Sequence, residues 1–386
     1  MPDTGPLATE SSQRVLRKPM QRAHIGPDPV TRSQPRPLTQ AVRHQPPSLL
    51  GVPSLLGEQV QWRHLTHDDV PAWNSLLANA ELVDKTGEHY DEGDLHEEMD
   101  DPATGPRDRI GGFVDGVLAV NAGVRARADA SEFIRIEGEG FVDPRWRGQG
   151  LGTEGVRWIL ERSREIHAER APDVLAKVHL FGYPDNLGQI ELLESHGFTP
   201  VNWSAVMRVR LDDGRELAAA RLPSEFTLLP YDLSWSARMR AAHNAAFLDH
   251  WGFVPWDEPM WQQWIDGSKN FRPDISWVVV DDADPEVVVA YVQSNEFDAY
   301  QAITGRREAY LGKIGVRREY RGRGLASALL RYALRGYRDA GYVESSLDVD
   351  TNNPTGAFGL YERAGFEVEK RMTIYEIEFT ASGSQT

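Results

Sequence analysis

The chain has 386 residues, 26% of them charged, with a formal net charge of −16, and its length accommodates two domains with separate hydrophobic cores. No stretch reaches the roughly 18 to 20 apolar residues of a membrane span, which argues against a membrane protein, and the acidic balance disfavours nucleic-acid binding. Because there is no cysteine, disulfides, a thiolate nucleophile and Cys-ligated metal sites are excluded.

Residues 1–57 are rich in proline, arginine and other polar residues and show neither helical nor alternating periodicity. This composition is typical of a disordered tail, because it offers too little apolar surface to offset the entropy of folding. A basic docking arm is the functional alternative for the same segment. The mark of an export signal, a basic segment followed by an apolar stretch, is absent, and we therefore expect a cytoplasmic location.

The first folded unit begins near Gln61, where a short strand precedes Thr66 or Asp68 as the cap of a periodic apolar helix. The Asp-Gly pair at 115–116 then stands between two apolar runs, which is the strongest short-range signal of a β-hairpin. Segment 142–166 (VDPRWRGQGLGTEGVRWILERSREI) leads through a corner rich in arginine and glycine into a helical pattern. Strand, helix and hairpin therefore precede this corner.

The same order of elements recurs in the second part of the chain. A strand is predicted at 226–233, a helix at 235–247, and two valine-rich strands joined by an Asp/Pro turn within 277–297. A second corner follows at 316–340 (VRREYRGRGLASALLRYALRGYRDA). Because the corner arginines and a later Gly-Phe pair repeat at nearly the same offset, we interpret the chain as a duplicated domain.

The boundaries of the two domains are placed where the pattern changes. We expect a first domain at 58–212, a charged linker at 213–224, a second domain at 225–380 and a tail at 381–386.

The second corner joins a strand at 310–316 to a helix with an apolar stripe from Leu325 to Tyr337. A helix start gathers unpaired N–H groups and the positive end of the helix dipole, so the glycines and arginines at 321–324 favour a polyphosphate ligand. An exposed basic turn that caps the helix is the structural alternative. A nucleotide-hydrolase P-loop and a dinucleotide fold are disfavoured, because neither corner has the required Lys-Ser/Thr pair or the full GxGxxG spacing.

Both corners share the pattern Arg-x-x-Gly-x-Gly/Ala, at Arg147, Gly150 and Gly152 and at Arg321, Gly324 and Ala326. This pattern resembles the acyl-CoA pyrophosphate loop of the GCN5-related N-acetyltransferase (GNAT) superfamily, as does VDTNNPTGAFGLYERAGF at 349–366. The tandem layout is similar to its mycothiol-synthase-like members. The resemblance covers about residues 60–380 and implies an α+β fold, with two tandem domains of mixed, mostly antiparallel twisted sheet flanked by helices. It also implies that the fourth and fifth strands splay apart, so that the pantetheine arm pairs with the fourth strand.

On this resemblance, coenzyme contacts are expected in both halves, with acetyl-CoA or another acyl-CoA as co-substrate and no metal. In the second half they are Ile314, Gly315, Val316, Arg321, Gly322, Arg323, Gly324, Leu325, Ala326 and Asn353. In the first half they are Phe141, Val142, Arg147, Gly148, Gly150 and Gly152, with Gly140 beside them. Helix capping explains Asn353 equally well, and the histidines show no paired spacing of metal ligands.

Acyl transfer to an amine releases a thiolate that must collect a proton, and a tyrosine, neutral at pH 7, can donate one. Asn353 is predicted as a helix cap, Pro354 as the first helical residue and Gly365 as the end of that helix, with Tyr361 at the edge of its apolar stripe. Core packing is the structural alternative, but Tyr361 falls where the resemblance puts the leaving-group acid of the family.

The first half lacks this tyrosine, because Leu193 takes its place. We therefore expect a non-catalytic first domain, although Tyr183 is a candidate substitute acid, and a catalytic second domain.

Two further sets of residues are candidates for the acceptor side. Glu308 resembles the carboxylate that the family carries on the run into the fourth strand and is the predicted base, while Asp348 and Asp350 share one face of the fifth strand and are alternatives. Asp350, with Trp251 and Trp256 from a loop punctuated by glycine and proline, is predicted to bind the acceptor. Trp261 and Trp264 are spaced as one helical face, which favours core packing.

We therefore expect an N-acyltransferase that moves an acyl group, most simply acetyl, from acyl-CoA directly to a primary amine of a small molecule. One alternative is a donor thioester on an acyl carrier protein as partner. The other is an acyl-CoA sensor without turnover, which Leu193 favours and Tyr361 opposes. The acceptor itself is not identified by the sequence.

Overall fold

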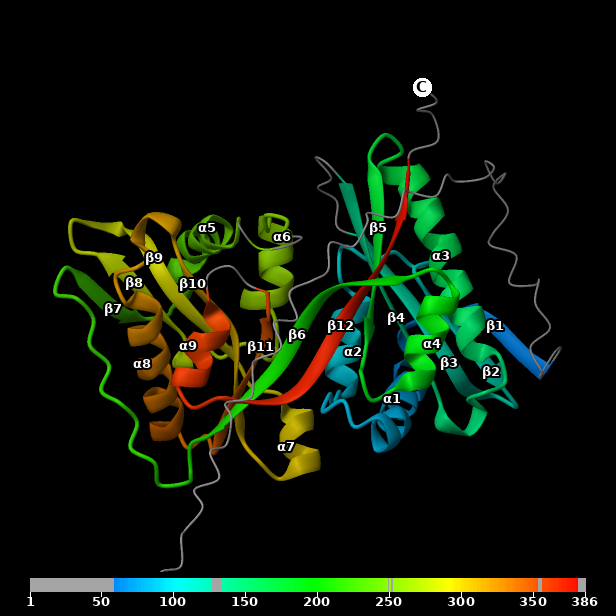
Figure 1. Cartoon of the computed structure of the whole chain (residues 1–386), viewed down its shortest axis with the longest axis horizontal. Coiled ribbons are helices and arrows are strands. Elements are labelled where there is room, and N and C mark those ends of the chain that lie inside the picture. The colour runs from blue at the N-terminus through cyan, green and yellow to red at the C-terminus, as the bar shows by residue number, and fades with distance from the viewer. Residues whose placement is uncertain (1–58, 127–132, 249, 251–252, 353–355, 381–386) are drawn as a thin grey trace, which may run out of the picture. The chain divides into compact units, whose positions relative to one another are not determined.

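The computed structural model describes residues 59–126, 133–248, 250, 253–352 and 356–380. The predicted tails at 1–57 and 381–386 lie outside the described residues. Two successive halves have nearly the same order of elements (Figure 1). The amino-terminal half, residues 59–210, contains β1 (Val60–His64), α1 (Val70–Asp84), α2 (Glu92–Met99), β2 (Arg109–Val114), β3 (Val117–Ala126), β4 (Phe133–Val142), α3 (Leu151–Arg170), β5 (Leu175–Gly182), α4 (Leu187–Ser195) and β6 (Thr199–Arg210).

The carboxy-terminal half, residues 226–380, repeats this order with one additional helix, α7. It contains β7 (Phe226–Pro230), α5 (Ser236–Phe247), α6 (Glu258–Trp261), β8 (Trp277–Asp281), β9 (Asp284–Asn295), α7 (Asp298–Thr304), β10 (Glu308–Val316), α8 (Leu325–Asp339), β11 (Glu344–Asp350), α9 (Ala357–Arg363) and β12 (Glu367–Phe379).

The local signals of the sequence explain most of these elements. β2 and β3 form the predicted hairpin, in which Asp115 and Gly116 have φ angles of 49° and 79°; two positive φ angles are what a two-residue turn needs to match the twist of its strands. In α8 the predicted stripe is buried along its length, from Leu325 at 1% exposure to Tyr337 at 0%. Each such side chain contributes roughly 1.5–3 kcal/mol to folding.

The predicted cap of the last helix differs from the structure. α9 begins at Ala357, after Gly356 with a φ angle of 71°, so the helix starts later than Pro354. A left-handed residue cannot lie inside a right-handed helix, which is the physical reason for the later start. Asn353 and Pro354 themselves lie outside the described residues.

All twelve described strands belong to one sheet, in the order β1-β2-β3-β4-β5-β12-β6-β11-β10-β9-β8-β7. Only the pairs β4–β5 and β10–β11 are parallel; the other pairs are antiparallel. The predicted fold class, a mixed and mostly antiparallel sheet flanked by helices, is confirmed.

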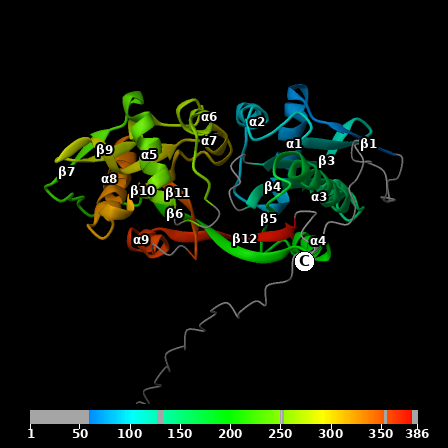
Figure 2. The ribbon, with the colours of Figure 1, turned by 90° about the horizontal axis from the view of Figure 1, so that it is seen from above.

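The last strand of each half pairs with the other half, which the sequence did not indicate. β12 pairs with β5 through Thr373–Phe379, and β6 pairs with β11 through Ser204–Arg210. The two long strands also pair with each other and run side by side between the halves (Figures 1 and 2). The hydrogen-bonded sheet thus continues across the predicted division at 213–224. The two domains with a linker between them therefore stay a proposal that rests on the sequence repeat.

The exchanged strands also complete the cores. In the amino-terminal half, Tyr375 and Phe379 of β12 are buried with side chains of α3 and α4. In the carboxy-terminal half, Ala205, Met207 and Val209 of β6 are buried with side chains of α8 and α9. Removing either strand would expose apolar surface in the opposite half, so the two halves depend on each other for stability.

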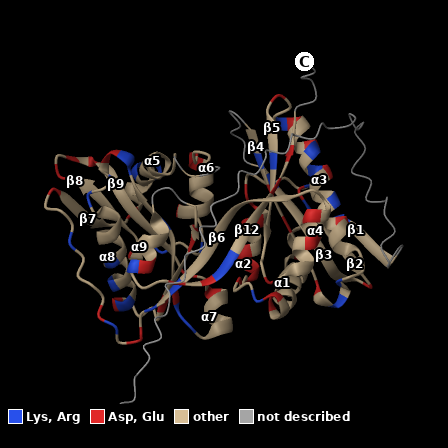
Figure 3. Ribbon diagram, viewed as in Figure 1, with Lys and Arg blue, Asp and Glu red and all other residues tan. Residues whose placement is uncertain are grey.

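Acidic and basic residues are interspersed over both halves, and basic residues stand at one end of β6 (Figure 3). None of the helices within the described residues is long and apolar enough to cross a membrane.

Candidate active site

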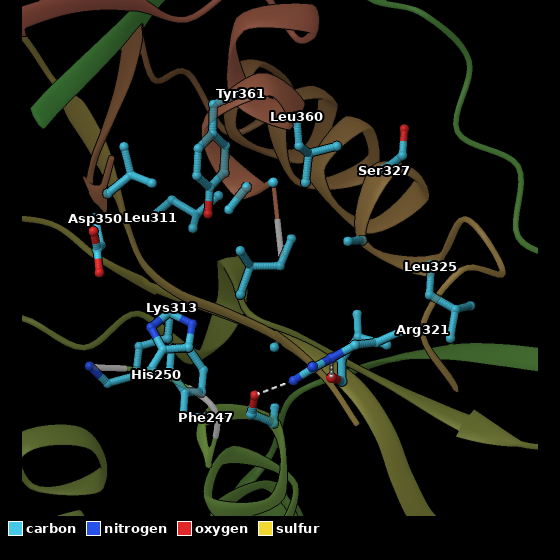
Figure 4. A pocket seen from close by; sticks show the side chains of 18 of the residues that line it. Phe247, His250, Leu311, Lys313, Arg321, Leu325, Ser327, Asp350, Leu360 and Tyr361 are labelled. Atoms are coloured by element: carbon cyan, nitrogen blue, oxygen red, sulfur yellow. Dashed lines mark hydrogen bonds between the residues drawn. The ribbon is translucent and has the colours of Figure 1, made fainter. Parts of the chain in front are cut away.

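A cavity of about 830 Å³ opens in the carboxy-terminal half between β10, β11 and the starts of α8 and α9. Its walls include nine of the predicted coenzyme and catalytic residues: Ile314, Gly315, Val316, Arg321, Gly322, Gly324, Leu325, Ala326 and Tyr361. Figure 4 shows this cavity with Tyr361 and Leu360 on one wall and Phe247 and His250 on the opposite one. Segments far apart in the sequence thus meet at one hollow.

The cavity exists because β10 and β11 separate. Their parallel pairing covers only Glu308–Tyr310 against Glu344–Ser346, although β10 continues to Val316 and β11 to Asp350. The register of β10 with β9 shifts between Leu311 and Lys313, which marks a bulge at the point of separation. Beyond Tyr310, the edge of β10 that faces β11 therefore has backbone groups to offer an extended ligand. The splay predicted from the resemblance is confirmed here and in β4–β5.

The glycine corner lies at the other end of β10. Gly322 and Gly324 have φ angles of 78° and 83°, a region that glycine enters without strain, and nothing lies within 4 Å of the position where either would carry a Cβ. The 15-residue helix α8 begins directly afterwards at Leu325. The corner thus leaves open space beside the start of a helix that has no side-chain cap, and the first N–H groups of a helix with room beside them are the arrangement that binds phosphate.

Arg321 and Arg323 of this corner have different surroundings. The Nη2 atom of Arg321 donates to the carbonyl of Ala246 at the end of α5 over 2.7 Å, which ties the corner to that helix. The guanidinium of Arg323 does not line the cavity and lies 5.3 Å from the centre of the Tyr320 ring. Of these two arginines, Arg321 alone lines the cavity.

Tyr361 lies on α9 with its ring directed into the cavity (Figure 4). Its side chain is 6% exposed, and this burial raises the pKa of the phenol. The hydroxyl consequently stays protonated at neutral pH and is able to donate a proton.

Asp348 and Asp350 lie on the same face of β11, and both line the cavity. Asp348 has an exposed surface toward the cavity, but the protein atoms around its carboxyl reduce its hydration and raise its pKa to about 7, with the negative charge of Glu88 as the next contribution. A carboxylate with a pKa near the working pH is suited to accept a proton. Asp350 accepts hydrogen bonds from the Asn202 side chain over 3.1 Å and from the Asn352 backbone N–H over 2.8 Å.

Glu308, the base predicted from the sequence, is buried at the paired end of β10 and does not line the cavity. Its carboxylate forms an ion pair with Arg208 of β6. The same guanidinium reaches Glu344 over 3.0 Å and Glu369 over 2.8 Å. Glu308 is thus part of a charged network that joins the two halves.

The predicted tryptophans are dispersed. Trp251 lies outside the described residues, and Trp256 is 8% exposed in an apolar cluster that also contains Trp261. Trp256 does not line the cavity, but the Nζ atom of Lys313, which does, lies 4.6 Å from the centre of its indole ring. The core position predicted for Trp261 is confirmed.

Sequence reasoning missed the contributions of Lys313 and of α5 to the cavity wall. Lys313 interrupts the apolar run YLGKIGV at 310–316, and a charged residue within a buried strand is the signal that would have indicated it. The end of α5 supplies Ala246 and Phe247 to the same wall, but this packing is a long-range contact with no local signal.

The corresponding corner of the amino-terminal half has the same backbone but different surroundings. Gly148 and Gly150 have φ angles of 74° and 89°, yet Arg147 forms a two-bond ion pair with Asp84, the last residue of α1, with both distances 2.7 Å. A Cβ atom at Gly152 would lie 3.0 Å from the side chain of Leu192. The guanidinium at this corner already has an anionic partner within the chain.

A hollow lined by Asp84, the partner of Arg147, and by Phe141 measures about 10 Å³, which is about the space of one water molecule. Leu193 is buried where the other half has Tyr361. Within the described residues, no group of three or more His, Asp or Glu side chains is arranged to hold a metal ion.

Comparisons with known proteins agree with this geometry. Residues 237–366 match the profile of the acetyltransferase (GNAT) family. The mycothiol acetyltransferase of Renibacterium salmoninarum is 24% identical over 240 residues, which are 61% of this chain and 65% of that relative, slightly less than two thirds of its length. A crystal structure of a GCN5-related N-acetyltransferase from Sphaerobacter thermophilus is 26% identical with a TM-score of 0.64, over 83% of this chain and 96% of that one. A tandem GNAT protein from the clavulanic acid biosynthesis pathway has 16% identity and a TM-score of 0.60, over 85% and 100% of the two chains; this likeness concerns the fold alone.

Proposed function

Because the chain carries an acetyltransferase domain of the GNAT family at residues 237–366 and is on that ground a transferase, we propose that it moves an acyl group from acyl-CoA to a primary amine of a small molecule. The family uses acetyl-CoA, and acetyl is the simplest group for this chain. The observation that carries the proposal is the cavity of about 830 Å³, since it joins the glycine corner, the unpaired part of β10 and Tyr361 in one hollow.

The acyl-CoA donor would lie along this hollow, and each part of the coenzyme would contact a different group of lining residues. The diphosphate is assigned to the N–H groups of the corner 321–326, where the helix dipole favours negative charge. The pantetheine arm is assigned to the backbone of Ile314, Gly315 and Val316, to which it adds like a further strand. This order brings the thioester toward Tyr361.

The proposed chemistry is direct attack in a ternary complex, without a covalent intermediate on the protein. The base first takes one proton from the ammonium, and the neutral amine nitrogen then attacks the thioester carbonyl carbon. The C–S bond breaks, the thiolate takes the proton of the Tyr361 hydroxyl, and the amide and free CoA leave. The second proton that the nitrogen loses returns through solvent to the phenolate, and the base releases its proton to solvent, so that every proton is accounted for.

We assign the base to Asp348, because it lines the cavity and its carboxyl has a pKa of about 7. Glu308 stays the alternative base predicted from the sequence; its ion pair with Arg208 at the paired end of β10 favours a structural role. The negative charges of Asp348 and Asp350 would also attract a cationic amine. A cytoplasmic location stays a prediction.

The direct experiment incubates the protein with acetyl-CoA and a panel of primary amines while free thiol is measured. We expect release of thiol that depends on the amine and a product heavier by one acetyl group in mass spectrometry. Tight binding of CoA without thiol release that depends on an amine would contradict the proposal and support an acyl-CoA sensor. Activity only with a thioester on an acyl carrier protein would support the carrier-protein alternative.

A matched pair of glycine variants tests which corner binds the coenzyme. Gly322 and Gly148 have φ angles of 78° and 74°, and no atom lies within 4 Å of a Cβ on either. Aspartate tolerates this backbone better than most residues, so both variants should fold. We expect G322D to weaken CoA binding at least tenfold, because its carboxylate repels the diphosphate, and G148D to change it less than twofold.

Isothermal titration calorimetry measures both the affinity and the number of sites in this test. We expect one tight equivalent of CoA per chain, since Arg147 is already paired with Asp84. Two equivalents, each weakened by one of the variants, would instead support the coenzyme contacts predicted at Arg147 and its neighbours.

A further inference from the structure

Asp350 stands at the wall of the cavity, and a side chain from the other half of the chain holds it. Figure 4 shows Asp350 on the opposite side of the cavity from Arg321 and Leu325, away from the glycine corner. Its Oδ2 atom accepts a hydrogen bond from the Nδ2 atom of Asn202 over 3.1 Å. Asn202 belongs to β6, the strand that the amino-terminal half inserts beside β11.

The hydrogen bonds around Asn202 form a closed set. Its Oδ1 atom accepts from the Nδ2 atom of Asn352 over 3.0 Å, and the backbone N–H of Asn352 donates to the second oxygen of Asp350 over 2.8 Å. Because the Asn202 oxygen is taken by a donor, its amide group can present only its N–H to Asp350. Asn202 is 5% exposed, and a buried amide with both ends bonded has one orientation.

A backbone hydrogen bond beside this set also joins the two halves. The N–H of Thr351 donates to the carbonyl of Trp203 over 2.9 Å, directly after the last paired residue of β11. The end of β11 and the carboxylate of Asp350 are therefore positioned by β6 and not by the carboxy-terminal half alone.

A carboxylate held in this way has a defined role toward a cation. It offers about four lone-pair directions, and the hydrogen bonds from Asn202 and Asn352 use two of them. These two bonds fix the plane of the carboxylate, and the plane in turn fixes where the remaining lone pairs point. An ammonium group that binds there is attracted by the charge and held by charge-assisted hydrogen bonds in the directions that remain, so the orientation of Asp350 affects how tightly the acceptor binds.

We propose that Asn202 is a positioning residue for the acceptor: it orients Asp350 to bind the acceptor ammonium, and the exchanged strand thereby makes the amino-terminal half a working part of the site. This inference rests on the proposed amine acyl transfer. It gives the amino-terminal half a function at the acceptor end that does not depend on a second coenzyme.

The test uses the whole chain of 386 residues and the amine that releases most thiol in the panel. We expect Asn202→Leu, which is close in size but cannot hydrogen-bond, to raise the KM for the amine about tenfold or more. The kcat should stay within threefold and the Kd for CoA within twofold, because the donor end of the cavity is untouched. Asn202→Ser is the second variant if leucine lowers the yield of folded protein.

A double-mutant cycle separates positioning from a general structural effect. If Asn202 acts through Asp350, then N202L should have no further effect on the KM in a protein that already carries D350N. The matched control is Asn79→Leu, which removes an Asn–Asp hydrogen bond of 3.0 Å to Asp143 within the amino-terminal half. This control should leave the KM for the amine unchanged.

The possible failures are distinguishable. An active wild type whose KM is unchanged by N202L, or is raised equally with and without D350N, overturns this inference and leaves the proposed function standing. A wild type that releases no thiol with any amine overturns both.

Discussion

Tyr361→Phe is expected to slow acyl transfer about 10²-fold or more at pH 7 while the Kd for CoA changes less than twofold. The change removes one hydroxyl from a ring that lines the cavity and leaves the ring in its core of α9 and neighbouring side chains. A positioned proton donor typically contributes ~10²- to 10⁴-fold to the rate. The loss should therefore appear in kcat, because the hydroxyl acts when the thiolate leaves and not when the substrates bind.

Single-turnover measurement of thiol release, together with calorimetry of CoA binding, checks this expectation. Tyr332→Phe serves as the control, because Tyr332 is 42% exposed, contacts the Trp277 ring from the edge and does not line the cavity. A Tyr361→Phe protein with a rate within threefold of the wild type would remove Tyr361 from the mechanism and leave core packing as its role.

Asp348→Asn is expected to lower kcat/KM at pH 7 by roughly 10²-fold or more and to change the shape of the pH profile. With a pKa of about 7, the wild-type carboxyl is protonated and inactive below pH 7 and ionised above it. The rate should thus rise about tenfold per pH unit up to 7 and then level off. Without the base, only the neutral amine reacts, on the order of one molecule in a thousand for a lysine-like amine at pH 7, so the rate should keep rising toward pH 10.

Steady-state kinetics from pH 5 to 10 with both variants of the predicted bases decides this assignment. Glu308→Gln should keep the bend near pH 7, since Glu308 faces Arg208 and not the cavity. If instead Glu308→Gln abolishes the bend and Asp348→Asn retains it, the base is Glu308, as the sequence predicted.

The carboxyl pKa of Asp348 illustrates why a sequence identifies candidates but not their assignment. Asp348 and Asp350 were recognisable as neighbours on one face of a strand, because side chains alternate along a strand. What raises the pKa of Asp348 is the reduced hydration of its carboxyl at the cavity wall and the charge of Glu88, a residue far away in the chain. Such a contribution depends on distances between segments that are far apart in the chain, and the periodicity of apolar residues in the sequence does not reveal these distances.

The two corners show the same difference between what the sequence predicts and what the tertiary structure adds. Their glycines and arginines repeat in the sequence, and the backbone of both has the positive φ angles that such glycines allow. The family resemblance of both corners implies coenzyme contacts in both halves, but the ion pair of Arg147 with Asp84 and the packing of Leu192 distinguish the two corners. Both partners come from elements outside the corner.

From the sequence alone follow the strand, helix and hairpin that open each half, the Asp115-Gly116 turn and the stripe that buries α8, because each depends on residues a few positions apart. The duplicated layout follows from the repeat of the same pattern in both halves. Only the tertiary structure decided that β6 and β12 change places, that Asn202 reaches Asp350, and that β10 and β11 enclose a cavity together with the glycine corner. The pairing of a strand with one of several similar edges is set by the total burial and hydrogen bonding of the whole sheet, and with two homologous halves the local signals on both edges are nearly the same.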